Sequence, residues 1–316
     1  MILILAGGFL YRPPIAIIGP APALDLSNDI KVTGVPTKKL NGQYLLVAVT
    51  LHQPNAFGAL WAMLDSKKQS LPLSALVPQG VSETEFDRLQ KGMFLESQQL
   101  AAAAAARAVG LPVTTTGTGA KILQVVKTAP AGKVLRTGDV ITEIEGKKVG
   151  LATDLKPIIS SRPPGTRLNV LIERKGKPLK VSVATIKLPN AAVLTAAIGV
   201  LAETRGLKVD LPFEIRFKKH PNIGGPSAGL SYALAVADLL DPADLARGRT
   251  IAASGTISLD GEVGEVGGLD EKAVAAERAK ASLLLVPTAE VKQLTPHQVK
   301  IRGAKTLQDA LGIVRN

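Results

Sequence analysis

Residues 220–230 read HPNIGGPSAGL and place one serine, Ser227, between glycines at the point where an extended segment gives way to a helix. Apolar residues alternate with charged residues over 213–217, which predicts a strand that leads into this turn. After Ser227, apolar residues recur at helical spacing to about position 237. The sequence therefore requires a strand–turn–helix unit with the serine at the start of the helix.

Ser227 at this position has the surroundings that acyl transfer needs. Unpaired N–H groups and the positive end of the helix dipole can stabilise an oxyanion at a helix N-terminus. Gly224, Gly225 and Pro226 precede the serine, and glycines let a substrate backbone come close. We interpret Ser227 as a nucleophile and these three residues as the oxyanion and substrate-backbone positions. The alternative is that Ser227 only caps the helix on a glycine-rich turn.

The positive charge is concentrated in one quarter of the chain. The formal net charge is +12, and residues 112–188 hold 14 Lys and Arg against 5 Asp and Glu. That segment favours anionic partners, but it contains no Phe, Tyr or Trp on which a base could stack. We therefore expect an acidic peptide terminus or a lipid headgroup surface rather than nucleic acid.

Several kinds of chemistry are disfavoured by what the sequence lacks. There is no cysteine, which excludes thiol catalysis, disulfides and thiolate metal sites. The three histidines, His52, His220 and His297, are too widely spaced to suggest a zinc site. No G-x-x-x-x-G-K-[ST] motif occurs, so the sequence gives no sign of an ATP-driven unfoldase. We therefore expect no cofactor, either metal or nucleotide.

Residues 1–10 form an unbroken run of apolar residues and glycine, too short to cross a bilayer. The run is read as part of a membrane anchor, with the apolar part of a signal peptide and a buried strand as alternatives. The Pro-rich residues 15–26 are expected to form an extended connector. This interpretation predicts a protein held in the cell membrane by a single span, with its domains outside the cytoplasm.

The other predicted elements complete a mixed α/β pattern. Strands at 30–34 and 44–51 are expected to form a hairpin, and residues 81–110, with alanines at 101–106, an internal helix. Within residues 112–188, short basic strands are expected at 122–126, 140–144, 168–173 and 179–184. A short helix is expected at 154–160. The remaining predictions are helices at 191–205, 269–280 and 307–314, and strands at 250–259 and 283–287.

Residues 138–149 read GDVITEIEGKKV and resemble a PDZ domain of the bacterial type, over nearly the whole of 112–188. The resemblance implies that an extended peptide or a peptide C-terminus binds by β-augmentation, with backbone N–H groups receiving the carboxylate. On that analogy the carboxylate loop lies at Thr118, Gly119, Ala120 and Lys121, although no clear GLGF-like loop occurs there.

Lys272 is the candidate base for the serine, because no histidine lies near Ser227 in the sequence apart from His220. It falls in the first turn of a predicted helix, directly after Asp270 and Glu271. A cation there opposes the helix dipole, and burial among the neighbouring apolar residues would lower the amine pKa further. The alternative is an exposed helix lysine, which describes most lysines.

The GGPSAG motif at 224–229 and the later ASGTISLDGEVGEVGGLDEKAVAA at 253–276 resemble the proteolytic domain of Lon proteases. The resemblance implies that Ser227 is the nucleophile and Lys272 the general base. Residues 32–46 and 93–106 resemble the opening strands and first helix of the same domain. The protease domain would then be split by the inserted PDZ module, as in a family of bacterial membrane-anchored PDZ and Lon-type proteases, which this chain resembles over nearly its full length. Gly224 departs from the ATP-dependent members, which carry an acidic residue three before the serine.

The expected fold is thus a mixed α/β, Lon-type proteolytic domain split by an inserted, mainly β PDZ domain. The predicted domains are an apolar segment and connector at 1–28, the protease domain at 29–111 and 189–316, and the PDZ domain at 112–188. The expected function is an ATP-independent serine endopeptidase that acts on peptide or protein substrates, as a monomer or a homo-oligomer.

Two other functions compete with this one. Residues 225–229 also fit G-x-S-x-G, the nucleophile elbow of α/β-hydrolases, with Asp260 or Asp270 and then His297 following in the required order. The Pro-containing loop before the serine disfavours that fold, which needs a strand running straight into the elbow. A non-catalytic PDZ scaffold is the second competitor.

Overall fold

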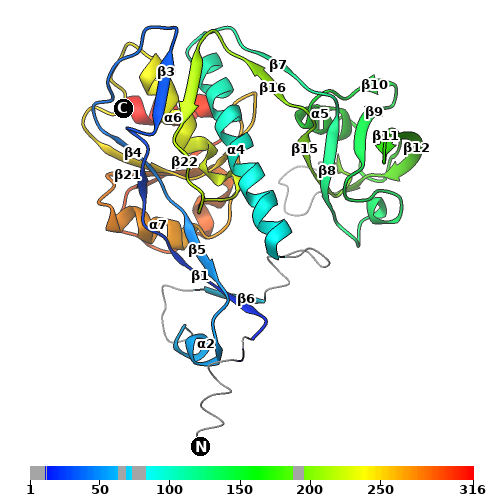
Figure 1. The fold of residues 1–316 in the computed structure, drawn as a ribbon, viewed down its shortest axis with the longest axis horizontal. Helices are drawn as coiled ribbons and strands as arrows, with labels where there is room; N and C mark the ends of the chain where they lie inside the picture. The colour runs from blue at the N-terminus through cyan, green and yellow to red at the C-terminus, as the bar shows by residue number, and fades with distance from the viewer. Residues whose placement is uncertain (1–10, 12, 63–68, 73–82, 188–195) are drawn as a thin grey trace, which may run out of the picture. The chain divides into compact units, whose positions relative to one another are not determined.

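The computed structural model describes residue 11 and residues 13–62, 69–72, 83–187 and 196–316, which form two compact units (Figure 1). The first unit comprises Met1–Val113 and Leu211–Asn316, and the second comprises Thr114–Asp210. The predicted anchor at 1–10 lies outside the described residues. Within the described part of the chain, no helix is both long and apolar enough to span a bilayer.

A five-stranded sheet in the order β2-β4-β18-β21-β22 forms the centre of the first unit. The last four strands are parallel, and β2 is antiparallel to β4 at one edge. The strands are β2 Leu24–Asp25, β4 Gln43–Leu46, β18 Thr250–Ala253, β21 Leu283–Pro287 and β22 Ile301–Ala304.

Helices cover both faces of this sheet, and the alternation of side chains along the strands explains why (Figure 1). Ile251 and Ala253 of β18 point into one core, with the helices α4, α6 and α8. Ala252, between them, points into the other core, with α7. The helices are α4 Glu83–Ala108, α6 Gly229–Leu240, α7 Leu269–Arg278 and α8 Leu307–Arg315.

The predicted internal helix at 81–110 is confirmed over residues 83–108. Residues 81 and 82 lie outside the described part of the chain. Its alanines 101–106 are at most 3% exposed, and α4 packs closely along α6. Small side chains allow two helices to approach in this way.

The predicted hairpin over 30–51 is wrong. β3 (Ile30–Thr33) pairs instead with β17 (Glu214–Phe217), while β4 enters the parallel sheet beside β18. Residues 15–26 are not a plain connector either, because they contain β1 (Ile15–Pro20) and β2. β1 is the central strand of a small sheet between β5 (Val49–His52) and β6 (Gln69–Pro72), and the short helix α2 (Ala56–Ala62) lies between β5 and β6 in the chain.

The second unit is a β-rich domain with its own core. Its sheet has the order β12-β11-β9-β8-β15, with the short β10 (Lys147–Lys148) paired to β9. Its buried residues include Ile122, Ile141 and Ile172. The strands are β8 Ala120–Val125, β9 Val140–Ile144, β11 Arg167–Arg174, β12 Lys177–Ala184 and β15 Val200–Thr204, and the helical segments are η1 Pro130–Lys133, η2 Ala152–Asp154 and α5 Leu155–Ser160.

The predicted helix at 191–205 is wrong where the structure describes it. β14 (Ala196–Ala197) pairs with β13 (Ile186–Lys187), and β15 pairs with β8. The compact second unit therefore continues past the predicted boundary at 188 to Asp210. At its two ends, β7 (Thr114–Thr116) pairs antiparallel with β16 (Lys208–Asp210).

Candidate active site

Ser227 lies in the short helical turn η3 (Pro226–Ala228), which runs directly into α6, and the residue is half-buried. The preceding Gly225 has φ +84°, a conformation that favours glycine, and its N–H donates to the carbonyl of Gln90 on α4 at 2.8 Å. At Gly224, a Cβ atom would lie 2.8 Å from Cβ of Gln90. The two glycines therefore let the turn pass directly against α4.

The other side of the serine turn is bound to the end of strand β18. The N–H of Gly255 donates to the Ser227 carbonyl at 2.9 Å, and the N–H of Leu230 donates to the Gly255 carbonyl at 3.0 Å. These two bonds are possible because the predicted strand at 250–259 is interrupted after Ala253, and pairing resumes only at β19 (Thr256–Ile257). Gly229 also requires a glycine, since a Cβ there would lie 2.9 Å from Ile257 Cγ2.

The three predicted backbone positions before the serine are not equivalent. Gly225 uses its N–H on Gln90, and Pro226 has no N–H. In this conformation neither can donate to an oxyanion. Of the three, Gly224 alone has an N–H that could do so, and the oxyanion role stays a prediction for that residue.

Lys272 lies in the first turn of α7, as the sequence predicts, and is 3% exposed. Its N–H donates to Gly268, the left-handed residue before the helix, at 3.0 Å. Burial lowers the pKa of the Lys272 amine from 10.5 to about 8, against the opposing attraction of Glu290 and Glu271. An amine with a pKa of about 8 is neutral in about one tenth of the molecules at pH 7 and in about half of them at pH 8.

The fold brings the Ser227 turn and the first turn of α7 to the same edge of the sheet. Gly255, bonded to Ser227, follows the carboxyl end of β18 directly. Gly268, before α7, lies against Val49, which follows the carboxyl end of the neighbouring parallel strand β4. α6 and α7 cover opposite faces of the sheet. This carboxyl edge of a parallel sheet is where open α/β folds bind their ligands.

Two residues without a predicted role also stand at this edge. Ser254 follows β18, is fully buried, and has a hydroxyl without a hydrogen-bond partner among the described residues. Glu290 in η4 (Thr288–Gln293) is 7% exposed and accepts the N–H of Val266 at 2.9 Å. Burial raises the pKa of Glu290, although Lys272 and the Val266 N–H act to lower it. The sequence gives no signal for either residue, because their positions at this edge depend on which strands are neighbours in the sheet.

The Ser227 hydroxyl and the Lys272 amine have no hydrogen bond to any described residue. Both groups are thus uncommitted within the part of the chain that the structure covers.

His297 is placed differently from what a Ser-His-Asp triad requires. Its Nε2 lies 2.9 Å from Asp270 Oδ1, and its Nδ1 lies 3.4 Å from Glu277 Oε1. A triad histidine needs one ring nitrogen for its carboxylate and the other for the serine. Both nitrogens of His297 face carboxylates, so the α/β-hydrolase alternative lacks its base in this conformation.

No cluster of three or more His, Asp or Glu suited to a metal ion occurs among the described residues.

The predicted carboxylate loop of the PDZ domain is occupied by internal bonds. The N–H groups of Thr118 and Gly119 donate to Arg205 and Gly150 at 2.9 Å each. Ala120 and Lys121 belong to β8, which is paired on both sides, and Lys121 binds Glu203 at 2.8 Å. These residues therefore do not form an open N–H nest here.

Among the described residues the sheet has two terminal strands, β12 and β15, and of these β15 contacts the helical segment η2. β15 is paired with β8 on one side and is a terminal strand of the described sheet. Its Leu201 is 51% exposed, and the hydroxyl of its Thr204 accepts the N–H of Ala152 in η2 at 3.0 Å. An exposed strand edge beside a helical segment is the surface to which an extended peptide can add.

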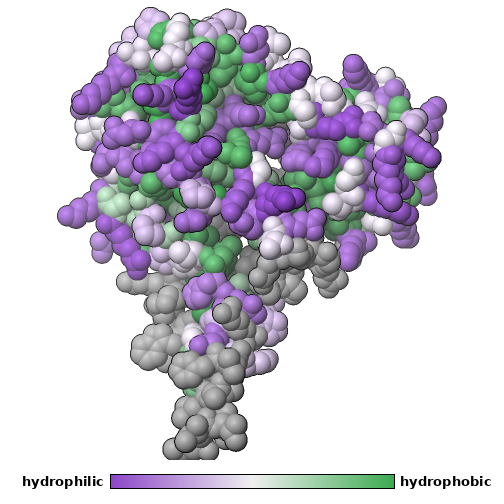
Figure 2. Space-filling view, in the orientation of Figure 1, coloured by the Kyte–Doolittle hydropathy of each residue, from purple (hydrophilic) through white to green (hydrophobic). Residues whose placement is uncertain are grey.

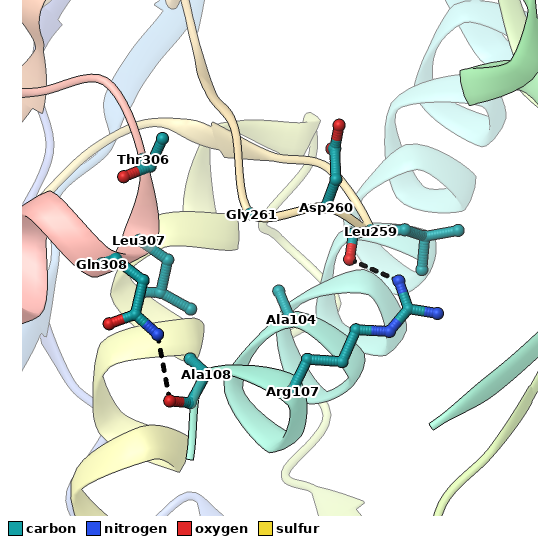
Figure 3. A pocket seen from close by; sticks show the side chains of 9 residues that line it. All are labelled: Ala104, Arg107, Ala108, Leu259, Asp260, Gly261, Thr306, Leu307 and Gln308. Carbon is teal, nitrogen blue, oxygen red and sulfur yellow. Dashed lines mark hydrogen bonds between the residues drawn. The ribbon is translucent and has the colours of Figure 1, made fainter. Parts of the chain in front are cut away.

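A cavity of about 180 Å³ in the first unit shares no lining residue with Ser227 or Lys272 (Figure 3). Arg107 Nη1 donates to the Leu259 carbonyl at 2.7 Å across it, and Gln308 Nε2 donates to the Ala108 carbonyl at 3.0 Å. These two side chains thus connect the C-terminal end of α4 to the segment at Leu259 and to the start of α8. The lining residues are Ala104, Arg107, Ala108, Leu259, Asp260, Gly261, Thr306, Leu307 and Gln308.

Two models of known protein families match this chain, each over a different part of it. The model of the Lon protease (S16) C-terminal proteolytic domain matches residues 220–311, and a PDZ domain model matches residues 107–185. The chain therefore contains a PDZ domain and a Lon-type proteolytic domain, and the predicted mixed α/β fold is confirmed.

Individual relatives match one or other part. The "Probable periplasmic serine endoprotease DegP-like" of Pseudomonas fulva is 41% identical over 71 residues, which is 22% of this chain and 15% of that protein. "Lon protease homolog 2, peroxisomal" of Caenorhabditis elegans is 30% identical over 199 residues, 61% of this chain and 24% of that protein. The PDZ domain of an SdrC-like protein from Listeria innocua is 26% identical with a TM-score of 0.25, over 27% of this chain and 92% of that one.

The chain spans less than a quarter of the length of these two sequence relatives. The matched parts are the PDZ domain and the Lon-type proteolytic domain.

Proposed function

We propose that this chain is a serine endopeptidase in which Ser227 is the nucleophile and Lys272 the general base, and which needs no ATP. The observation that carries the proposal is the burial of Lys272, 3% exposed, in the first turn of α7. A buried lysine with a pKa lowered to about 8 is suited to general-base catalysis, and it lies at the sheet edge where the Ser227 turn leads into α6.

In the first half of the reaction, neutral Lys272 accepts the proton of the Ser227 hydroxyl while Oγ attacks the substrate carbonyl carbon. The resulting oxyanion then collapses to an ester on Ser227, and the lysine ammonium gives its proton to the leaving amine. In the second half, Lys272 takes a proton from water, which attacks the ester and releases the acid. The proton returns to Ser227 Oγ, and both residues recover their starting state.

The test is labelling of the full chain with a fluorophosphonate probe, together with cleavage of a short peptide in EDTA without nucleotide. Ser227→Ala and Lys272→Ala should each abolish cleavage, and Lys272→Arg should fail as well, because guanidinium does not deprotonate. Ser231→Ala, one turn further along α6, is the matched control and should remain active. Turnover that persists in Lys272→Ala, or probe on another serine, would refute the dyad.

The PDZ domain is proposed to select the substrate. An extended segment of a peptide or protein would add to the open edge of β15, and its backbone would supply the hydrogen bonds. The excess of basic residues over 112–188 would favour a free C-terminal carboxylate.

The proposed location is the outer face of the cell membrane, with the N-terminus as the anchor. Support comes from the sequence alone, in the apolar run at 1–10. Fractionation of the native protein tests this: it should remain with membranes after carbonate washing. Recovery in the soluble cytosolic fraction would refute the membrane location and would leave the peptidase proposal untouched.

A further inference from the structure

The segment between η4 and β22 is bound to α7 through His297, which lies between two carboxylates of that helix. The ring is 7% exposed, with Nε2 2.9 Å from Asp270 Oδ1 and Nδ1 3.4 Å from Glu277 Oε1. Asp270 is in the first turn of α7, and Glu277 lies seven residues later on the same face. One imidazole therefore connects the two ends of the helix.

Backbone groups of the same segment strengthen both attachments. The N–H and hydroxyl of Thr295 donate to Asp270 Oδ1 at 3.0 and 2.6 Å. The N–H groups of Gln298 and Val299 donate to Glu277, the latter at 3.3 Å. Although desolvation acts to raise the pKa of Asp270, the hydrogen bonds from Thr295 and His297 hold that pKa below its ordinary value. These hydrogen bonds thus favour the charged form of the Asp270 carboxylate.

Lys272 belongs to the turn that this attachment holds. It follows Asp270 by two residues, so the two side chains leave the helix in different directions. Asp270 is 45% exposed and points to the segment, whereas Lys272 is 3% exposed and points to the core. The first turn of a helix has few backbone bonds of its own, because its N–H groups lack partners within the helix. The attachments of Thr295 and His297 to Asp270 therefore add to the single bond from the Lys272 N–H to the Gly268 carbonyl in holding this turn.

We propose that His297 is a positioning residue, which holds the first turn of α7 closed and so keeps the Lys272 amine away from water at the carboxyl edge of the sheet. The inference rests on the proposed function only in that Lys272 is taken as the base. His297 itself touches neither Ser227 nor the Lys272 amine among the described contacts.

A specific pH effect follows from this arrangement. Desolvation is the largest cause of the lowered pKa of Lys272, and Glu290 and Glu271 oppose it. If the turn opens, water reaches the amine, and its pKa rises toward the ordinary 10.5. The charged groups that face His297 are Asp270 and Glu277. Removing the ring, as in His297→Ala, deprives both carboxylates of their contact with an imidazole nitrogen.

The experiment measures kcat and KM against pH for the full chain and for His297→Ala and Asp270→Asn. We expect the rising limb of kcat to move about one pH unit upward, with KM unchanged. At pH 8 this corresponds to a loss of about five-fold in kcat, which is recovered near pH 10.5. An unchanged profile, or a loss equal at every pH, would overturn the positioning role.

A second readout separates this inference from the peptidase proposal. Competitive acetylation of Lys272 against pH, mapped by mass spectrometry, reports the pKa of its amine whether or not it is catalytic. A raised pKa in His297→Ala with no matching change in cleavage would support the positioning role and refute the role of Lys272 as base. An unaltered amine pKa would refute the positioning role alone.

Tyr44→Phe is the matched control for a general loss of stability. It removes the 2.8 Å bond to the buried Asp238, near the other end of α6, and should leave the pKa of Lys272 unchanged. If His297→Ala does not fold, His297→Gln keeps a donor for Asp270 and is expected to lie between the native chain and Asp270→Asn.

Discussion

Lys272 carries a stability cost that can be measured without an assay of proteolysis. Its pKa falls from 10.5 in an open environment to about 8 in the folded chain, which corresponds to about 3 kcal/mol. Lys272→Met, which keeps the length without the charge, should therefore raise the free energy of unfolding at pH 7 by up to about 3 kcal/mol.

The sign of the pH dependence distinguishes this cause from better packing. The unfolded chain binds more protons than the folded chain between pH 8 and 10.5, so stability of the native chain rises with pH across that window. The advantage of Lys272→Met should be full below pH 8 and should disappear by about pH 10.5. Urea unfolding at several pH values measures it. A constant difference at all pH values would mean that the amine is not desolvated.

At the residue scale, the sequence was informative where the chemistry is local. The glycines around Ser227 and the acidic residues before Lys272 are adjacent in the chain, so the serine turn and the unusual position of the lysine could be recognised. Ser254, Glu290 and the His297 attachment depend on which strands are neighbours. His297 and Asp270 are 27 residues apart, and no local pattern relates them.

At the element scale, predictions succeeded where periodicity and burial agree and failed where pairing is long-range. The helices near 83–108, 229–240, 269–278 and 307–315 were predicted from apolar periodicity and helix propensity, and in the structure Thr306 caps the last of them. The segment at 196–204 is rich in alanine and was predicted to be helical, but pairing with β8 makes it a strand. The strands β3 and β4 are adjacent in sequence, yet each pairs with a strand more than 170 residues away, so a hairpin was the wrong choice.

At the scale of the whole molecule, the two ends of the PDZ unit determine how it can be removed. The predicted boundary at 188 would leave β14 and β15 behind, and β15 would then lose its partner β8. The pairing of β7 with β16 places Thr114 opposite Asp210. Paired residues on antiparallel strands lie about 5 Å apart, so a short Gly-Ser link can join Val113 to Leu211 without moving either end.

Deleting residues 114–210 in this way should leave short-peptide cleavage within about two-fold of the full chain, because Ser227, Lys272 and their hydrogen-bond partners all lie in the first unit. Cleavage of a long protein substrate should fall at least ten-fold, since the open edge of β15 is lost with the unit. Circular dichroism and thermal unfolding check that the first unit folds. Equal loss on short and long substrates would place residues 114–210 in the chemistry itself.

In the full chain, the same long substrate with an amidated C-terminus should be cut more slowly than with a free carboxylate, and the difference should shrink as salt rises. Equal rates for the free and amidated substrates would instead limit β15 to backbone pairing, without a contribution from the basic charge of the unit.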